Sequence, residues 1–262
     1  MKKINSILFI PAKEKMVPKI GKLGADAYII DLEESVEEEC KENARTRLAV
    51  LLNNTNIHEK IFVRVNRETI WEELQIIDRY PEIGIVVPKF ETIDDFGSEE
   101  IEIFRRHELI ALVETARGVV NIEKIASDAS VNAVAFGAED YTVNTGMKKT
   151  NENLFYVKSR LVLFAKAYGK AIYDTPSFDL HDVEKFVKEV QIAVDMGFDG
   201  KLAIHPKQID VIMQLFNNYD IDWMKKIVEK YEEQEGAVLL FEGHVYEQMH
   251  IDNFKKIIRE YE

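Results

Sequence analysis

The stretch GFDGKLAIHP, residues 197–206, holds a short apolar run with a lysine near its head and a histidine and a proline at its end. Strands buried in parallel sheets are usually unbroken apolar runs. Polar residues at both ends of this run therefore indicate a strand whose tip meets a ligand. Seven earlier runs in the chain have the same character, which makes this strand one of a set.

The eight runs alternate with longer segments whose apolar residues recur every three or four positions, as in EECKENARTRLAVLLNN (38–54) and NLFYVKSRLVLFAKAYG (153–169). Strict alternation of strand and helix favours a parallel sheet. Eight such units, in a chain close to the roughly 250 residues typical of the fold, predict a (β/α)8 TIM barrel over residues 1–215. An open doubly wound sheet is the less favoured alternative. The runs lie at 6–10, 27–31, 61–65, 84–88, 109–114, 133–137, 170–174 and 201–205.

The pattern changes after Gln208 to helix-like segments alone, WMKKIVEKYEEQEG (223–236) and NFKKIIREYE (253–262), with AVLLFEGHVYEQMH between them. We therefore expect a C-terminal helical extension over residues 216–262, serving as a lid, as an arm between subunits or as a final barrel helix with additional segments. No repeat or Pro/Gly-rich linker marks a further domain.

Composition restricts the classes of partner. The chain has 34 Lys and Arg against 47 Asp and Glu, a formal net charge of -13, which works against binding to nucleic acid or anionic membranes. Cys40 is the single cysteine, so neither an intrachain disulfide nor a thiolate metal cluster is expected. No apolar run approaches the roughly 20 residues of a membrane span, and ILFIPA is too short for a signal peptide. A cytoplasmic protein is expected.

Charged side chains stand at the ends of nearly all the runs, where the catalytic groups of a barrel lie. A single charge at such a place is commonly solvated or caps the next helix. Arg64 in FVRVN and Glu114 in ALVETARG have apolar neighbours, however, and a lone charge there would be costly to desolvate. We therefore expect a shared polar site drawn from Lys13, Asp31, Glu33, Glu34, Arg64, Asn66, Lys89, Glu114, Glu139, Asp140, Asp174 and His205.

The residue types in this set indicate its chemistry. Glu114 and Asp140 supply the hard oxygen ligands that Mg²⁺ takes, with coordination positions left for substrate. Asp31, Glu33 and Glu34 are candidates to hold metal-bound water, and Arg64 offers a planar fork for a carboxylate. A divalent metal with an arginine stabilises an enolate or alkoxide while a carbon-carbon bond is made or broken.

The order of motifs resembles the citrate lyase beta-subunit-like proteins of the HpcH/HpaI aldolase and citrate lyase group. Nine motifs over about the first 210 residues carry the resemblance: SILFIPA, GADAYIIDLEESV, KENAR, FVRVN, GIVVPK, LVETARGVVNIEKIA, AFGAEDYT, YDTPSFDL and MGFDGKLAIHPKQI.

This resemblance implies a TIM barrel with Mg²⁺ that joins or separates a 2-oxo acid, such as oxaloacetate, pyruvate or glyoxylate, and an acetyl-type thioester of CoA or an acyl carrier protein. It implies a trimer or hexamer as well. Glu114 and Asp140 match the metal ligands and Arg64 the arginine at the oxo acid. Glu33 and Glu34 match an acidic pair near the metal-bound waters, and Lys201 and His205 match the family signature GKxxIHP, where they are expected to shape the site and anchor the next helix. We also expect the remaining candidates to shape the site or contact substrate: Lys13, Asp31, Lys89, Gly137, Ala138 and Glu139.

Several positions depart from the family pattern. Ala12 replaces a usual glycine, and the loop that follows is about one residue short, which affects contacts to nucleotide or pantetheine. Glu34 in DLEES replaces an aspartate. Glu247 in FEGHVYEQM stands where relatives often carry an acid/base aspartate, so we expect Glu247 to act in proton transfer.

The sequence thus predicts a Mg²⁺-dependent lyase for a citryl-, malyl- or citramalyl-type thioester. One alternative is a metal-dependent aldolase on free 2-oxo or hydroxy acids, which the altered loop after Pro11 favours. Another is a binding or assembly component that has lost turnover.

Overall fold

The computed structural model describes residues 3–13, 20–54, 59–234 and 236–261. The chain divides into two compact units, residues 4–216 and residues 217–262 together with 1–3.

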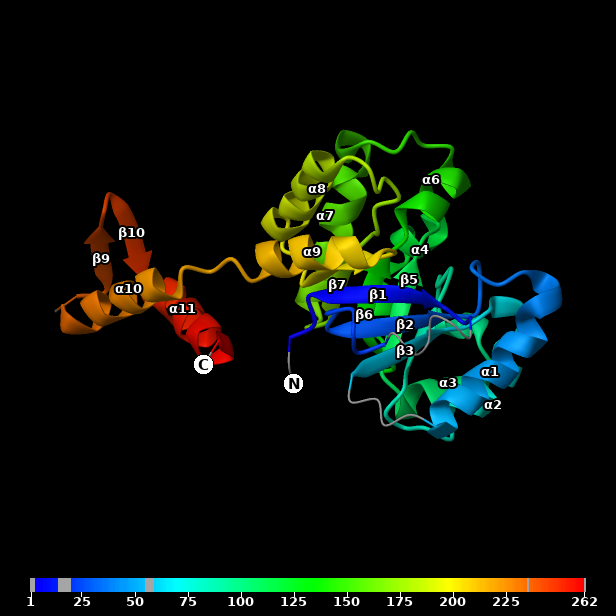
Figure 1. Ribbon diagram of the computed structural model, residues 1–262. Coiled ribbons are helices and arrows are strands. Elements are labelled where there is room, and N and C mark those ends of the chain that lie inside the picture. Colours follow the sequence, from blue (N-terminus) through cyan, green and yellow to red (C-terminus); the bar gives the residue numbers. More distant parts are fainter. Residues whose placement is uncertain (1–2, 14–19, 55–58, 235, 262) are drawn as a thin grey trace. The chain divides into compact units, whose positions relative to one another are not determined.

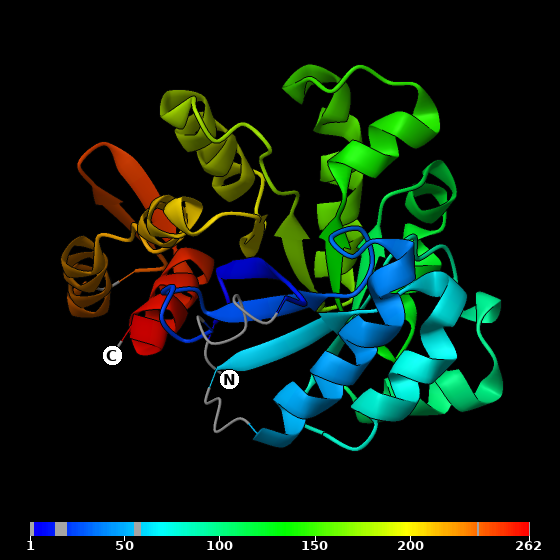
Figure 2. The same ribbon diagram turned by 45° about the vertical axis from the view of Figure 1, so that its right-hand side comes forward.

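The first unit is a closed barrel of eight parallel strands, which confirms the TIM barrel (Figure 1, Figure 2). Consecutive strands pair in order around the ring, and β8 closes it by pairing with β1. The strands are β1 (Ser6–Pro11), β2 (Ala27–Asp31), β3 (Lys60–Arg64), β4 (Gly84–Val87), β5 (Leu109–Val113), β6 (Val131–Phe136), β7 (Ala171–Asp174) and β8 (Gly200–Ala203).

Successive side chains of each strand point to opposite sides of the barrel wall, because the side-chain period of a strand is two residues. They form two apolar layers. One set packs with the surrounding helices and forms the larger core. The other set fills the barrel interior, so the barrel is solid and the substrate must bind at its rim. The buried interior residues are Ile7, Ala27, Ile29, Phe62, Val86, Ile110, Leu112, Ala133, Ala135, Tyr173 and Leu202.

Gly200, in the stretch GFDGKLAIHP, permits the ring to close. A Cβ at this position would lie 2.9 Å from Asn5 Cα, closer than side chains pack, so only glycine lets the start of β8 approach the start of β1. The approach is fixed by a hydrogen bond of 2.8 Å from the Lys201 amide to the Asn5 carbonyl.

Helices follow the strands as expected. Thr115, Thr150 and Asp182 cap three of them by accepting a backbone N–H, the usual role of these residue types at helix starts. The helices of this unit are α1 (Lys41–Asn54), α2 (Ile70–Ile77), α3 (Ser98–Arg106), α4 (Ala116–Val120), α5 (Ile122–Ser127), α6 (Ala138–Thr145), α7 (Asn151–Ala167), α8 (Val183–Asp195) and α9 (Ile209–Phe216).

The second unit contains helices α10 (Ile221–Glu233) and α11 (Gln248–Tyr261) and, between them, a hairpin of β9 (Val238–Phe241) and β10 (His244–Glu247). The expectation of helices alone missed this hairpin. Its two-residue turn is Glu242–Gly243, both with positive φ (51° and 82°), the geometry that suits the twist of a hairpin. Ile227, Leu239, Tyr246 and Ile251 form a small core of its own.

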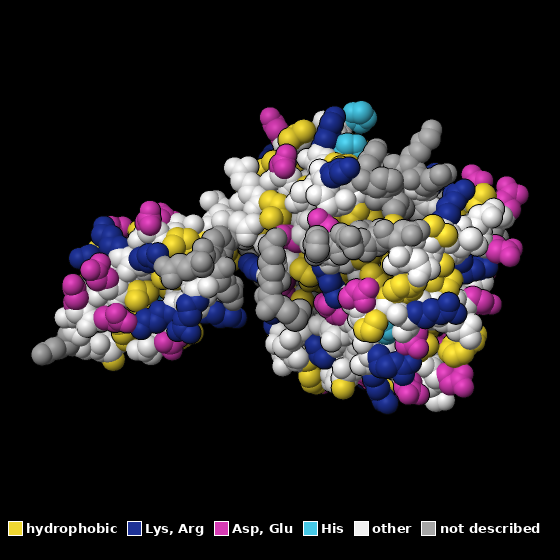
Figure 3. Space-filling model, turned by 60° about the horizontal axis from the view of Figure 1, so that its bottom comes forward, with side chains coloured by type: hydrophobic (Ala, Val, Ile, Leu, Met, Phe, Trp, Pro, Cys, Tyr) yellow, Lys and Arg dark blue, Asp and Glu magenta, His cyan; other side chains and the backbone are white. Residues whose placement is uncertain are grey.

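Within the described residues, none of the helices has the length and apolar character that crossing a bilayer requires. On the face seen in Figure 3, acidic and basic side chains are interspersed, and the described residues there form no continuous basic surface.

Candidate metal and substrate site at the barrel rim

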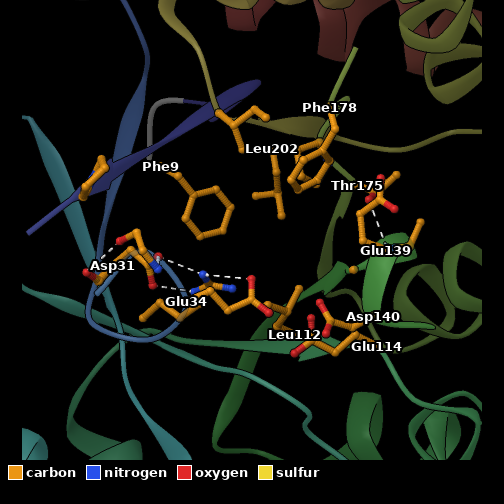
Figure 4. A pocket seen from close by; sticks show the side chains of 17 residues that line it. Phe9, Asp31, Glu34, Leu112, Glu114, Glu139, Asp140, Thr175, Phe178 and Leu202 are labelled. Carbon is orange, nitrogen blue, oxygen red and sulfur yellow. Dashed lines mark hydrogen bonds and ion pairs between the residues drawn. The ribbon is translucent and has the colours of Figure 1, made fainter. Parts of the chain in front are cut away.

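A cavity of about 320 Å³ opens at the carboxyl ends of the barrel strands. Figure 4 shows Phe9, Leu202 and Phe178 around it, with acidic side chains below them. One end of the cavity is therefore apolar and the other highly charged. The lining residues are Phe9, Pro11, Asp31, Glu34, Ser35, Arg64, Leu112, Glu114, Gly137, Ala138, Glu139, Asp140, Thr175, Pro176, Phe178, Leu202 and Ile204.

Arg64 and Asp31 form a bidentate pair between the ends of β3 and β2. Arg64 Nε donates to Asp31 Oδ1 at 2.7 Å and Nη2 to Oδ2 at 2.8 Å. Asp31 also accepts the backbone amides of Glu33 and Ser35, each at 3.0 Å. Burial acts to raise the pKa of Asp31, but the bonds from Arg64 hold it below its usual value. Both carboxylate oxygens of Asp31 are thus already engaged.

Two further carboxylates surround the same guanidinium. Arg64 Nη1 lies 3.1 Å from Glu33 Oε2, and Nη2 lies 3.5 Å from Glu34 Oε2. The ring of Phe9 covers the guanidinium, with Cζ 4.9 Å from the ring centroid. Glu33 also pairs with Lys89, whose Nζ lies 3.3 Å from Oε1. The carboxylates raise the pKa of Arg64 although burial opposes them, so Arg64 stays charged.

Glu114 follows β5 and is only 2% exposed. Its Oε1 accepts the Lys89 backbone amide at 2.8 Å, and Lys89 adopts a left-handed φ of 48° to present that amide. Backbone strain of this kind in a residue other than glycine often marks a functional site. Burial, with the nearby charge of Asp140 next in size, raises the pKa of Glu114 to about 8. Figure 4 shows the carboxylates of Glu114 and Asp140 side by side.

Gly137 makes room for Glu114. A Cβ on Gly137 would overlap Glu114 Oε2 and lie 2.8 Å from Glu114 Cβ. The glycine therefore lets the end of β6 pass against the Glu114 carboxylate, and Asp140, in the first turn of α6, reaches the same place.

The donor set fits magnesium. Mg²⁺ is commonly bound through one or two carboxylates, its other positions filled by water and substrate oxygens. Glu114 and Asp140 provide such a pair, and their mutual repulsion favours a cation between them. Within the described part of the chain, no group of three or more His, Cys, Asp or Glu residues is arranged to hold a metal, so a cage made wholly of protein ligands is absent there.

The other predicted site residues differ in whether they line the cavity. Gly137, Ala138 and Glu139 line the cavity, and Glu139 forms an ion pair with Lys149. Lys13 is exposed. The segment between Ala12 and Gly24 is predicted to be about one residue short, and its residues 14–19 lie outside the described residues.

Lys201 and His205 lie outside the lining of the cavity. Lys201 is buried and donates to Asp174 Oδ2 at 2.6 Å. His205 precedes the short turn Pro206–Gln208, where its Nδ1 accepts the Lys207 amide and its own amide donates to Gln208. That both residues shape the site and anchor the next helix stays a prediction.

Glu247 ends β10 in the second unit and is exposed. Its backbone amide donates to His250 Nδ1 at 3.0 Å. Its expected part in proton transfer stays a prediction, as do the roles of the other site residues.

Sequence reasoning missed the apolar half of the cavity and one hydroxyl. Phe9 and Leu202 belong to runs that were identified as strands, but which side chains of a strand face the rim depends on the register around the barrel. The hydroxyl is Thr175, directly after β7. The pattern of a polar residue at each strand end indicates the preceding residue, Asp174, instead.

Curated proteins with similar sequences include two that are named for acyl-CoA substrates. The mitochondrial citramalyl-CoA lyase of Mus musculus is 29% identical over 268 residues, covering 88% of this chain and 77% of the relative. The (3S)-malyl-CoA thioesterase of Cereibacter sphaeroides is 29% identical over 259 residues, covering 94% and 90%.

Among solved structures, protein CitE from Mycobacterium tuberculosis in complex with magnesium, acetoacetate and coenzyme A superposes with a TM-score of 0.81 at 26% identity, covering 99% of both chains. The sequence model of the HpcH/HpaI aldolase/citrate lyase family matches residues 5–206. This match confirms the resemblance inferred from the nine motifs. The chain belongs to the HpcH/HpaI aldolase/citrate lyase family.

Proposed function

We propose that the protein is a Mg²⁺-dependent carbon-carbon lyase that acts on a malyl- or citramalyl-type acyl thioester of CoA. The observation that carries the proposal is the pair of carboxylates, Glu114 and Asp140, at the end of the cavity that also holds Arg64. Family membership and the substrates named for the two curated relatives support it.

Glu114 and Asp140 would hold the metal. When bound, Mg²⁺ supplies a Lewis acid for the hydroxyl and carboxylate oxygens of the substrate. Glu33, which pairs with Arg64 and Lys89, is the proposed acceptor of hydrogen bonds from water at the metal. The buried, covered guanidinium of Arg64 is a fixed positive charge where negative charge develops on the oxo-acid fragment.

Bond cleavage requires loss of the substrate hydroxyl proton, for which Glu247 is the proposed acceptor. The electron pair of the O–H bond then forms the carbonyl of the 2-oxo acid. The electrons of the carbon-carbon bond pass to the thioester fragment as an enolate, which takes up a proton to give the acetyl-type thioester. In this proposal the second unit is a lid or an arm between subunits of a trimer or hexamer, and the protein is cytoplasmic.

Charge within the cavity favours an oxo acid with one carboxylate. Arg64 is the only cation in the described lining, and two of its nitrogens already bond Asp31. A second substrate carboxylate, as in oxaloacetate, would face acidic neighbours there without a counter-charge. Leu112, Leu202 and Phe9 instead offer an apolar surface for a hydrogen or methyl group. Glyoxylate and pyruvate have this form.

The test is a coupled assay for 2-oxo acid release, with and without Mg²⁺, on malyl-, citramalyl- and citryl-CoA and on free citrate, with release of the CoA thiol followed in parallel. Metal-dependent formation of oxo acid from malyl- or citramalyl-CoA is expected. Release of thiol without oxo acid would mean thioester hydrolysis. Turnover of free acids with indifference to CoA would mean an aldolase, and both results contradict the proposal.

Two variants and a matched control tie the activity to the metal pair. Glu114→Gln and Asp140→Asn are expected to abolish turnover and weaken Mg²⁺ binding. Asp78→Asn removes a carboxylate that lies outside this lining and pairs with Arg106, so most of the activity should remain. Full activity of both metal-pair variants would show that the metal assignment is wrong.

A further inference from the structure

Three charged side chains are buried together beside the cavity but outside its lining. Asp174 at the end of β7 and Lys201 on β8 are 0% and 1% exposed, and Lys158 of α7 is 5% exposed. Asp174 Oδ2 lies 2.6 Å from Lys201 Nζ, and Oδ1 lies 2.8 Å from Lys158 Nζ. Burying ions is expensive even when they are paired, so this buried cluster of Asp174, Lys158 and Lys201 calls for a function.

Thr175 connects the buried cluster to the start of α6, which carries Asp140 of the metal pair. Lys201 Nζ donates a second hydrogen bond, of 2.6 Å, to the backbone carbonyl of Thr175. The Thr175 hydroxyl in turn accepts the backbone amide of Ala138 at 3.0 Å. Figure 4 shows Thr175 on the same side of the cavity as Glu139, on α6. Ala138 opens α6, and Asp140 lies two residues further on.

The hydrogen bond from Ala138 has a particular importance because α6 lacks a local cap. The first N–H groups of a helix have no partner within the helix, and the side chain of the preceding residue commonly satisfies one of them. The preceding residue here is Gly137, which has no side chain to give and makes no cap bond. It cannot be replaced by a capping residue, since any Cβ there would overlap the Glu114 carboxylate.

We propose that Thr175 is a positioning residue of the metal site, which caps α6 from the neighbouring strand end and thereby fixes Asp140, and that Lys201 holds Thr175 in place. The close approach of Gly137 to Glu114 excludes a cap from α6 itself. The next strand supplies the acceptor, and the buried cluster keeps the backbone of that strand end from moving. The inference rests on the proposed function in taking Asp140 as a metal ligand.

The experiment measures binding of Mn²⁺ alone to the full-length protein by titration calorimetry and by the loss of the free-ion spin-resonance signal. Thr175→Val keeps the shape but removes the acceptor, and about a tenfold loss of Mn²⁺ affinity is expected, the lower end of what outer-layer substitutions produce. Thr175→Ser keeps the hydroxyl and should bind within about twofold of the unaltered protein.

Thr92→Val is the matched control. Thr92 is also buried, and its hydroxyl also accepts a backbone N–H at the start of a helical turn, that of Asp94. The Thr92→Val variant should have a lower melting temperature than the unaltered protein and the same Mn²⁺ affinity. Equal Mn²⁺ affinity of Thr175→Val and the unaltered protein would overturn the inference, as would failure of Thr175→Ser to restore binding.

Asp140→Asn separates this inference from the proposed function. If Asp140→Asn weakens Mn²⁺ binding while Thr175→Val does not, only the positioning role fails. If Asp140→Asn binds Mn²⁺ normally, the metal assignment fails and the positioning role fails with it. Lys201→Met should resemble Thr175→Val in Mn²⁺ affinity. Should that variant not fold, the Thr175 pair still decides the question.

Discussion

The guanidinium of Arg64 is fixed by two parallel hydrogen bonds to the carboxylate of Asp31, 2.7 and 2.8 Å long, between the ends of adjacent strands. The planar fork of arginine fits a carboxylate in this way, and a lysine ammonium does not. The positive charge is thereby held in place before substrate arrives, so little reorganisation is needed as the reaction proceeds.

Arg64→Lys is therefore expected to retain the charge but lose its position. Because an error of about 1 Å in a catalytic group can lower the rate about 100-fold, we expect kcat to fall by about that factor. Mg²⁺ affinity should change little. Steady-state kinetics on the preferred thioester, with calorimetry for the metal, measure both quantities. A kcat within about threefold of the unaltered enzyme would show that the bidentate geometry is not required.

Gly137→Ala tests the contact between the end of β6 and Glu114. The added Cβ would overlap Glu114 Oε2, so either the carboxylate or the start of α6 must move. We expect Mg²⁺ affinity to fall at least tenfold. Gly97→Ala is the control, because its Cβ would have as its nearest neighbour Glu100 Oε2 at 3.6 Å, an ordinary contact. Equal loss of affinity in both variants would contradict the explanation.

The barrel could be predicted from the sequence because the patterns that indicate its strands and helices lie within short segments. Each strand is an apolar run, and each helix has apolar residues at helical spacing. A charged residue directly after a strand lies near the rim of the barrel, whichever way the neighbouring strands are paired. Glu114 and Asp140 were found in this way, and the structure places them side by side. The family resemblance then supplied the chemistry.

What the sequence concealed depends on contacts between distant residues. The pairing of Lys158 with Asp174 joins a helix face to a strand end 16 residues later, and no local pattern indicates it. The selection of Phe9 and Leu202 for the cavity follows from the register of the closed barrel. The hairpin in the second unit was missed for a different reason. Its Glu242–Gly243 turn is not one of the Asn-Gly, Asp-Gly or Gly-Gly pairs that mark such hairpins in a sequence, and the helical periods on both sides favoured helix.

Glu73 gives the fold a pH dependence. It lies on α2, fully buried, and accepts the Asn66 amide at 2.6 Å and the Thr69 hydroxyl at 3.0 Å. Burial raises its pKa to about 7, from an ordinary value of 4.5. Between these two pH values the folded state keeps a proton that the unfolded state has lost, so stability falls as pH rises through this window.

The measurement compares the unaltered protein with Glu73→Gln, which resembles the protonated form at every pH. Between pH 4.5 and pH 7, the free energy of unfolding of the unaltered protein should fall by about 3 kcal/mol relative to that of Glu73→Gln. Above pH 7 the difference between the two proteins should stay constant. Urea denaturation of both proteins at a series of pH values measures this difference. A difference that is independent of pH would show that the Glu73 pKa is not raised.

Asp174 has the largest expected effect on stability. It is the one carboxylate that the described structure places in contact with both Lys158 and Lys201, so Asp174→Asn would leave two buried ammonium groups without a counter-charge. Removing one partner of a buried ion pair typically costs about 3–5 kcal/mol, and we expect a loss in that range by urea denaturation. Asp78→Asn is the control, because the ion pair of Asp78 with Arg106 is partly exposed and should contribute at most about 1 kcal/mol.

Lys158→Met distinguishes the charge from the packing. This variant leaves Asp174 and Lys201 as a balanced pair and fills the space of the lysine stem with a chain of similar length. If the excess positive charge is what makes Asp174 indispensable, Lys158→Met should be much less destabilising than Asp174→Asn, and the double variant should recover part of the loss caused by Asp174→Asn alone. Equal losses for the two single variants would mean that hydrogen bonding and shape, rather than charge balance, hold this cluster together.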